Sequence, residues 1–133
     1  MAKTELFSRK TSGGVYVVNN ESRTTGNIYF VDSGSSTGGT SAGFGSSPDA
    51  PFTTIDSAIN QTTANNGDII YVMAGHSETL TGASAITCDV AGVSIIGMGR
   101  GSDRPTLLLD AGASVSIVVS AANVYWENVV FSA

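Results

Sequence analysis

Short apolar runs separated by turn residues recur along the chain from residue 28 onward. Each run is of strand length and is closed by Gly, Asn, Asp or Ser, and after residue 68 no room is left for helices between them. The runs that predict strands cover residues 28–31, 69–73, 85–88, 93–96, 106–109, 116–119, 124–126 and 129–131. The pattern therefore predicts an all-β protein built from short strands joined by turns.

The spacing of these runs favours one β architecture. The offset from Ile86 to Ile117 is 117 − 86 = 31, and the offset from Val93 to Val124 is 124 − 93 = 31. Two successive strands thus repeat with the turn between them unchanged in length. A period of about 20 to 50 residues that contains some three strands is typical of one coil of a parallel β-helix. A β-sandwich with coincidental spacing remains the alternative on this evidence alone.

A helical pattern precedes the first of the repeating strands. Residues 33–47 are almost entirely Gly, Ser and Thr, a composition typical of a flexible loop without a core. Residues 48–59 then predict a helix that Thr53 or Thr54 caps, with one apolar face formed by Phe52, Ile55, Ala58 and Ile59. Such a helix would cover the first coil, whose core and strand edges would otherwise be exposed.

An isolated apolar island lies near the N-terminus, within a segment of mixed charge over residues 1–26. The island consists of Val15, Tyr16, Val17 and Val18. A single strand cannot bury itself, so it must dock on the main body or on a partner. We therefore expect residues 1–26 to form an N-terminal arm that docks through the island, and residues 27–133 to form the capped start of the β-helix.

Four sequence runs follow one another within residues 27–133: SPDAPFTTIDSAI, NGDIIYVMAGHSETL, VAGVSIIGMGRGSDRPTLLLD and SAANVYWENVVF. In this order they resemble the beginning of right-handed parallel β-helix proteins of the pectate-lyase-like superfamily, especially those encoded in bacteriophage structural gene regions. The resemblance implies that the helix caps the solenoid, that the Gly67–Asp68 turn leads into the first coil, and that GVSIIGMG supplies a core strand of the next. Residues 1–26 lie outside the resemblance.

Composition and charge exclude several classes of partner. The net charge of −5 and the sequence pI near 4.5 argue against a surface that neutralises phosphates, so we expect no nucleic-acid partner.

Cys88 is the single cysteine, which leaves no intrachain disulfide and no thiolate-rich metal site, and we interpret it as an apolar filler. No apolar run approaches the roughly 20 residues of a membrane span, and the N-terminus lacks the apolar run of a signal peptide. We expect a soluble protein made in a cytoplasm.

The titratable residues do not predict a catalytic site. Sugar lyases and hydrolases of this fold would need a carboxylate pair, or acidic calcium ligands with a basic residue, on one lateral face. We interpret Asp89 and Asp110 as turn-forming residues and Asp103 with Arg104 as a solvated pair. The full set of candidates is Glu78, Asp89, Asp103, Asp110 and Glu127, with Arg100 and Arg104 as the cations. His76 lies beside Ser77 and near Asp68, but adjacent side chains diverge, so we expect no triad. We predict no catalytic, cofactor or metal site.

Tyr125 and Trp126 form the aromatic pair that could stack a sugar. Side chains alternate along a strand, so we expect one ring in the core and the other partly exposed, with sugar binding as the alternative. The sequence then stops inside an apolar strand at residues 129–133, which would leave an open edge. We expect the natural chain to continue beyond Ala133, with cover by another subunit as the alternative.

Two functional hypotheses follow from these expectations. In the first, the chain is a phage virion structural protein, a capsid decoration, fibre or tail spike that residues 1–26 hold to the capsid or tail. In the second, it is the N-terminal part of a polysaccharide lyase, hydrolase or carbohydrate-binding β-helix whose groove lies in later coils; a cell-surface adhesin is a third class. The missing signal peptide favours the first. The partners of such a virion protein would be other virion proteins and host-surface polysaccharide. Further copies of the chain are also expected as partners, and the resemblance implies a trimer.

Overall fold

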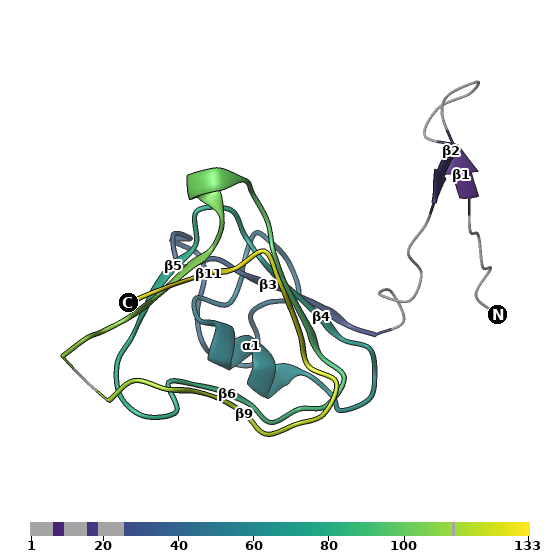
Figure 1. Cartoon of the computed structure of the whole chain (residues 1–133). Coiled ribbons are helices and arrows are strands. Elements are labelled where there is room, and N and C mark those ends of the chain that lie inside the picture. Colours follow the sequence, from purple (N-terminus) through teal and green to yellow (C-terminus); the bar gives the residue numbers. More distant parts are fainter. Residues whose placement is uncertain (1–6, 10–15, 19–25, 113) are drawn as a thin grey trace.

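The computed structural model describes residues 7–9, 16–18, 26–112 and 114–133, and from residue 26 onward the chain winds into a parallel β-helix (Figure 1). Strand β3 (Ile28–Val31) comes first. The first full coil contains β4 (Ile69–Val72), β5 (Ser77–Leu80) and β6 (Ile86–Cys88). The second contains β7 (Ser94–Gly97), β8 (Thr106–Leu109) and β9 (Ile117–Val119). Strands β10 (Tyr125–Glu127) and β11 (Val130–Ser132) follow them.

Strands at equivalent places in successive coils form three parallel sheets, in the orders β10-β7-β4-β3, β11-β8-β5 and β6-β9. Ile86 of β6 pairs with Ile117 of β9, and Ser94 of β7 pairs with Tyr125 of β10, again an offset of 125 − 94 = 31. The predicted period is therefore confirmed as one coil, and the sandwich alternative is wrong. The preceding coil is shorter, because Ile69 pairs with Ser94 at an offset of only 94 − 69 = 25.

The difference in coil length lies in the corners that join the strands. The corner between the β10-β7-β4-β3 sheet and the β11-β8-β5 sheet occupies residues 73–76, 98–105 and 128–129 in successive coils. Its length is thus 76 − 72 = 4, then 105 − 97 = 8, then 129 − 127 = 2. The longest version contains a short 3-10 helix, η2 (Gly101–Asp103). The strands nevertheless stay in register across all three corners.

The core consists of inward-facing columns of apolar side chains. Ile70, Ile95 and Trp126 occupy equivalent positions in β4, β7 and β10, so they form one such column. Ile70 and Ile95 are 0% exposed, and Trp126 packs against the same cluster. Because side chains alternate along a strand, each short strand contributes its inward residues to these columns. Full burial of each aliphatic side chain stabilises the fold by roughly 2 kcal/mol.

Helix α1 (Ile55–Gln61) covers the end of the first coil and lies within the outline of the coils in Figure 1. Its buried residues Ile55, Ala58 and Ile59 belong to the same core cluster as the strands. The predicted capping helix is therefore confirmed. The Thr54 hydroxyl accepts the Ser57 N–H at 3.3 Å, so Thr54 is the N-cap.

The helix begins later than residue 48 because the segment before it is held by β3. Phe52 donates its backbone N–H to the Phe30 carbonyl at 2.8 Å, and its own carbonyl accepts the Asp32 N–H at 2.8 Å. The Gly- and Ser-rich segment 33–47 also bonds to β3, since the Phe30 N–H donates to the Gly45 carbonyl at 2.8 Å. Phe44 of this segment packs against the core. Residues 33–47 therefore form a loop, as predicted, but the expectation that this loop contributes nothing to the core is wrong.

Two strands were not expected from the apolar pattern. β5 carries a single buried apolar residue, Leu80, and therefore lacks an apolar run. β1 (Phe7–Arg9) pairs antiparallel with β2 (Tyr16–Val18). The prediction of an isolated strand in this part of the chain is wrong, because Tyr16, Val17 and Val18 have a strand partner. Val15 lies outside the described residues.

Candidate functional site

On the capped side of the first coil, the backbone N–H groups of the strands have no complete neighbouring coil to bond. For β5, the Ser77 N–H donates to the hydroxyl of Ser33 at 3.1 Å. For β6, the Thr87 N–H donates to the carboxylate of Asp56 on α1 at 3.0 Å. Strand β4 is covered by β3. A buried N–H without a partner costs about 1–3 kcal/mol, so the cap supplies these acceptors for structural reasons.

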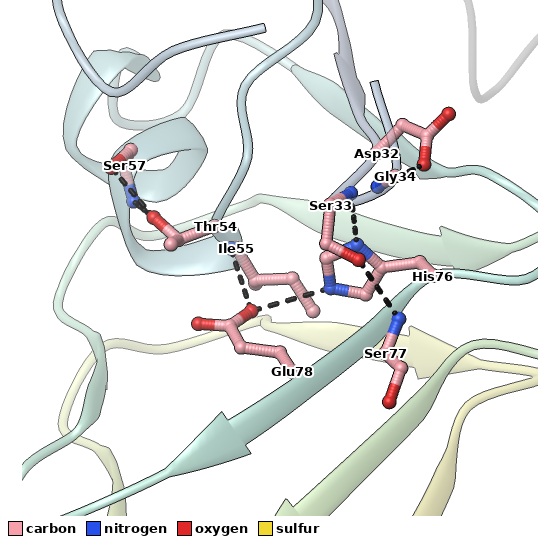
Figure 2. Close-up of polar contacts among 9 residues, drawn as sticks. All are labelled: Asp32, Ser33, Gly34, Thr54, Ile55, Ser57, His76, Ser77 and Glu78. Carbon is pink, nitrogen blue, oxygen red and sulfur yellow. Dashed lines mark hydrogen bonds and ion pairs between the residues drawn. The ribbon is translucent and has the colours of Figure 1, made fainter. Parts of the chain in front are cut away.

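The main group of polar contacts at this end is the cap cluster, which consists of Ser33, Ile55, His76, Ser77 and Glu78 (Figure 2). His76 is 1% exposed. Its Nδ1 accepts the backbone N–H of Ser33 at 3.0 Å, and its Nε2 lies 3.3 Å from Oε2 of Glu78. Because Nδ1 is an acceptor, the neutral ring carries its proton on Nε2 and donates it to the carboxylate.

Glu78 occupies an inward position that the next coils fill with apolar side chains. It is in register with Leu107 of β8, which pairs in turn with Phe131 of β11. The carboxylate Oε2 also accepts the backbone N–H of Ile55, the first residue of α1, at 3.2 Å. Two donors therefore satisfy an acid that would be costly in the middle of the solenoid. Glu78 ties the start of α1 and the ring of His76 to β5.

The geometry differs from that of a nucleophilic Ser–His–acid set. Ser33 offers His76 its backbone N–H, and its hydroxyl accepts the Ser77 N–H instead. Asp68, which is 0% exposed, accepts the backbone N–H groups of Asn27 and Thr63 at 2.8 and 2.7 Å. These groups thus make hydrogen bonds that join distant segments of the fold.

Sequence reasoning did not anticipate the cap cluster as a unit. His76 and Glu78 are two positions apart in an extended stretch, and this spacing places side chains on the same face. This spacing in the sequence could have predicted the contact between His76 and Glu78. The contact with Ser33 could not be predicted, because 43 residues separate Ser33 from His76 along the chain.

The aromatic pair is split between the core and the surface, as alternation predicts. Trp126 is partly buried, and its ring lies 5.6 Å from that of Phe131 with an interplanar angle of 57°. Tyr125 is 43% exposed on the outside of β10. Sugar stacking by Tyr125 or Trp126 stays a prediction.

The remaining acidic candidates are dispersed over the surface. Asp89, Asp103, Asp110 and Glu127 are all exposed. Asp110 accepts the Gly112 N–H at 2.9 Å and so forms the predicted side-chain turn. Within the described ranges no three His, Cys, Asp or Glu side chains gather in a way that could hold a metal ion.

Two groups in the core have perturbed acidity. Burial raises the pKa of the Cys88 thiol, which lies in the core cluster as the predicted apolar filler. Burial also raises the pKa of the Tyr29 phenol, and the negative charge of Asp68 adds to this effect. Both groups therefore keep their protons at neutral pH.

Comparisons with protein-family models, with curated proteins and with solved structures found no match. Among the helices of the described residues, none is long and apolar enough to cross a membrane. The assignment to a parallel β-helix therefore rests on strand pairing and register, which place β4 to β11 in three parallel sheets.

Proposed function

We propose that the chain belongs to a phage virion structural protein, in which the β-helix projects from the particle as a capsid decoration, fibre or tail spike. One observation supports this most strongly. α1 and Ser33 close one end of the solenoid, and the coils stack away from that end. Residues 1–26 precede the closed end in the chain, so an arm there would attach a rod whose sides stay accessible.

The chemistry of the described coils also supports a structural role. His76, Glu78 and Asp68 all make hydrogen bonds that join the cap to the first coil. Such bonds stabilise a solenoid end that would otherwise expose strand edges. The resemblance of residues 27–133 to phage-encoded β-helix proteins points in the same direction.

The proposed docking element is the two-stranded sheet of β1 and β2. Two strands alone are marginally stable in water, so contact with a capsid or tail protein would stabilise them. The proposed particle form is a homo-oligomer, with a trimer expected from the resemblance, located in the virion.

Purified particles from the source of this sequence provide the test. Mass spectrometry should detect peptides from this chain, and replacement of Tyr16, Val17 and Val18 by Ser should abolish incorporation while the far-ultraviolet circular dichroism of the coils is retained. The matched control is Leu108→Ser, which replaces an exposed apolar residue on the outer face of β8. Particles that lack the wild-type polypeptide would overturn the proposal.

A carbohydrate-binding or polysaccharide-degrading β-helix is the second candidate, and the outer face of the four-stranded sheet favours it. Tyr125 lies on this face. The rings of Phe30 and Tyr71 lie on it as well and stack on each other, with 6.1 Å between their centroids and an interplanar angle of 26°. Aromatic rings on an exposed face suit stacking against sugars. Calorimetry with host surface polysaccharide should show binding that Tyr125→Ala weakens, and release of reducing ends or unsaturated sugars would favour the enzyme over the structural role.

A further inference from the structure

The cap cluster contains the single histidine of the chain, buried and hydrogen-bonded through both ring nitrogens. We propose that His76 is a pH-sensitive latch that holds the backbone at Ser33 to the first coil when the ring is neutral and releases it when the ring is protonated. The proposal concerns the cap alone and does not depend on the function proposed above.

The latch follows from the direction of one hydrogen bond. The Ser33 N–H points at Nδ1 of His76 across 3.0 Å, a contact that requires a lone pair on that nitrogen (Figure 2). Protonation places a second hydrogen on the ring, at Nδ1, so two donors would face each other and the bond would be lost. Histidine is the side chain that ordinarily changes charge between pH 5 and 8.

The charge of Glu78, which bonds the ring directly, determines which side of the cluster opens. Glu78 bonds Nε2, and this contact becomes an ion pair when the ring is protonated. The carboxylate of Asp32 accepts the Gly34 N–H, and that of Asp56 on α1 accepts the Thr87 N–H. At the neighbouring corner the Arg104 side chain bonds the carbonyl of Gly101. Protonation therefore strengthens the side of the ring that faces Glu78 and weakens the side that faces Ser33.

Release would be local because each partner has another way to satisfy its bonds. Ser33 is exposed, so its freed N–H can bind water. Glu78 keeps its bond to the Ile55 N–H and so continues to hold α1. The expected result at acidic pH is a loosened segment after β3 above coils that stay folded.

Amide hydrogen exchange on the whole chain tests the latch. After correction for the intrinsic rate, the Ser33 amide should lose protection by roughly fivefold between pH 7.5 and pH 5, the factor that one lost hydrogen bond implies. His76→Asn keeps an acceptor in place of Nδ1 without a titratable ring, so its Ser33 amide should stay protected at both pH values. The fluorescence of Trp126 should show that the coils remain folded throughout.

Two results of this experiment would overturn the proposal. The first is a wild-type Ser33 amide whose corrected protection does not change with pH, and the second is the same pH dependence in His76→Asn. If that variant does not fold, the nitrogen-15 chemical shifts of the wild-type ring replace it. A proton on Nδ1 at pH 7.5, or a Ser33 amide shift that does not follow the ring titration, would then overturn the proposal.

Discussion

Buried polar side chains in this solenoid lie at its cap and at the turn before β4, where they satisfy particular backbone groups. Asp68 is the clearest case, because it accepts the N–H groups of Asn27 and Thr63 and the side-chain amide of Asn66. It thus connects the start of β3, the end of the α1 region and the turn into β4. Its value to the fold comes from the donors that would otherwise be left unsatisfied.

Replacement of this carboxylate tests that account. Asp68→Ala should lower the free energy of unfolding by about 3 kcal/mol or more, since three donors lose their acceptor. Asp68→Asn keeps one acceptor oxygen and should lose less. The control is Asp110→Ala, which removes an exposed turn-forming carboxylate and should cost under about 1 kcal/mol. Urea unfolding followed by fluorescence measures all three, and equal losses at residues 68 and 110 would contradict the assignment.

The Cys88 thiol should be unreactive in the native protein because burial shields it and raises its pKa. The folded pKa lies above the unfolded value, so the fold favours the protonated thiol. Its contribution to stability is complete below that value and is lost as the pH rises through the folded pKa. A disulfide reagent at pH 8 should label Cys88 only in urea, and Cys88→Val should lessen the loss of stability above pH 9. Rapid labelling without urea would show that the thiol is accessible.

At the scale of elements, apolar runs identified most strands because the inward residues that form the core columns are apolar. The strand expected over residues 106–109 has the same bounds as β8. β5 could not be found this way, because one of its inward residues, Glu78, is charged and accepts the backbone N–H of Ile55 in α1. The start of the helix was also misplaced, because a tertiary bond between Phe52 and Phe30 overrides the local pattern.

The N-cap of α1 allows a direct test, because two adjacent threonines were candidates. Thr54→Ala should destabilise the protein by about 1 kcal/mol, as the hydroxyl that accepts the Ser57 N–H is lost. Thr53→Ala is the matched control and should cost less, because Thr53 bonds the Gly39 carbonyl through its backbone N–H. Thermal unfolding of both variants measures the difference. A larger effect at Thr53 would mean that the helix begins one residue earlier.

For the molecule as a whole, the sequence predicted the architecture through a repeat that only part of the chain obeys. The same offset of 117 − 86 = 31 and 125 − 94 = 31 holds from β6 to β9 and from β7 to β10, whereas β4 and β7 are offset by 94 − 69 = 25. The cap cluster could not be predicted because its contacts depend on where Ser33 lies after folding. Local periodicity carries information on strands and none on which loops meet at the end of a solenoid.

The stacked columns predict that core damage in one coil weakens the whole solenoid. Ile95→Ala removes a fully buried side chain between Ile70 and Trp126 and should cost about 2–5 kcal/mol. Ile96→Ala, one residue along on the outer face of β7, should cost under about 1 kcal/mol. Circular dichroism and Trp126 fluorescence should report the same shifted midpoint, since neighbouring coils share an interface. Separate midpoints, or equal costs at the two positions, would contradict a continuous core.

The corner between β7 and β8 differs in length from the equivalent corners of the other coils. The paired strands must keep their geometry, whereas the length of this corner can change. Insertions at residues 98–105 would lengthen a surface corner without shifting the inward columns, because the neighbouring strands keep their own pairing. The exposed turn of η2 within it is therefore a natural place to display a foreign peptide on the side of the rod. Diversity at this edge can accumulate through added residues while the scaffold beneath it stays the same.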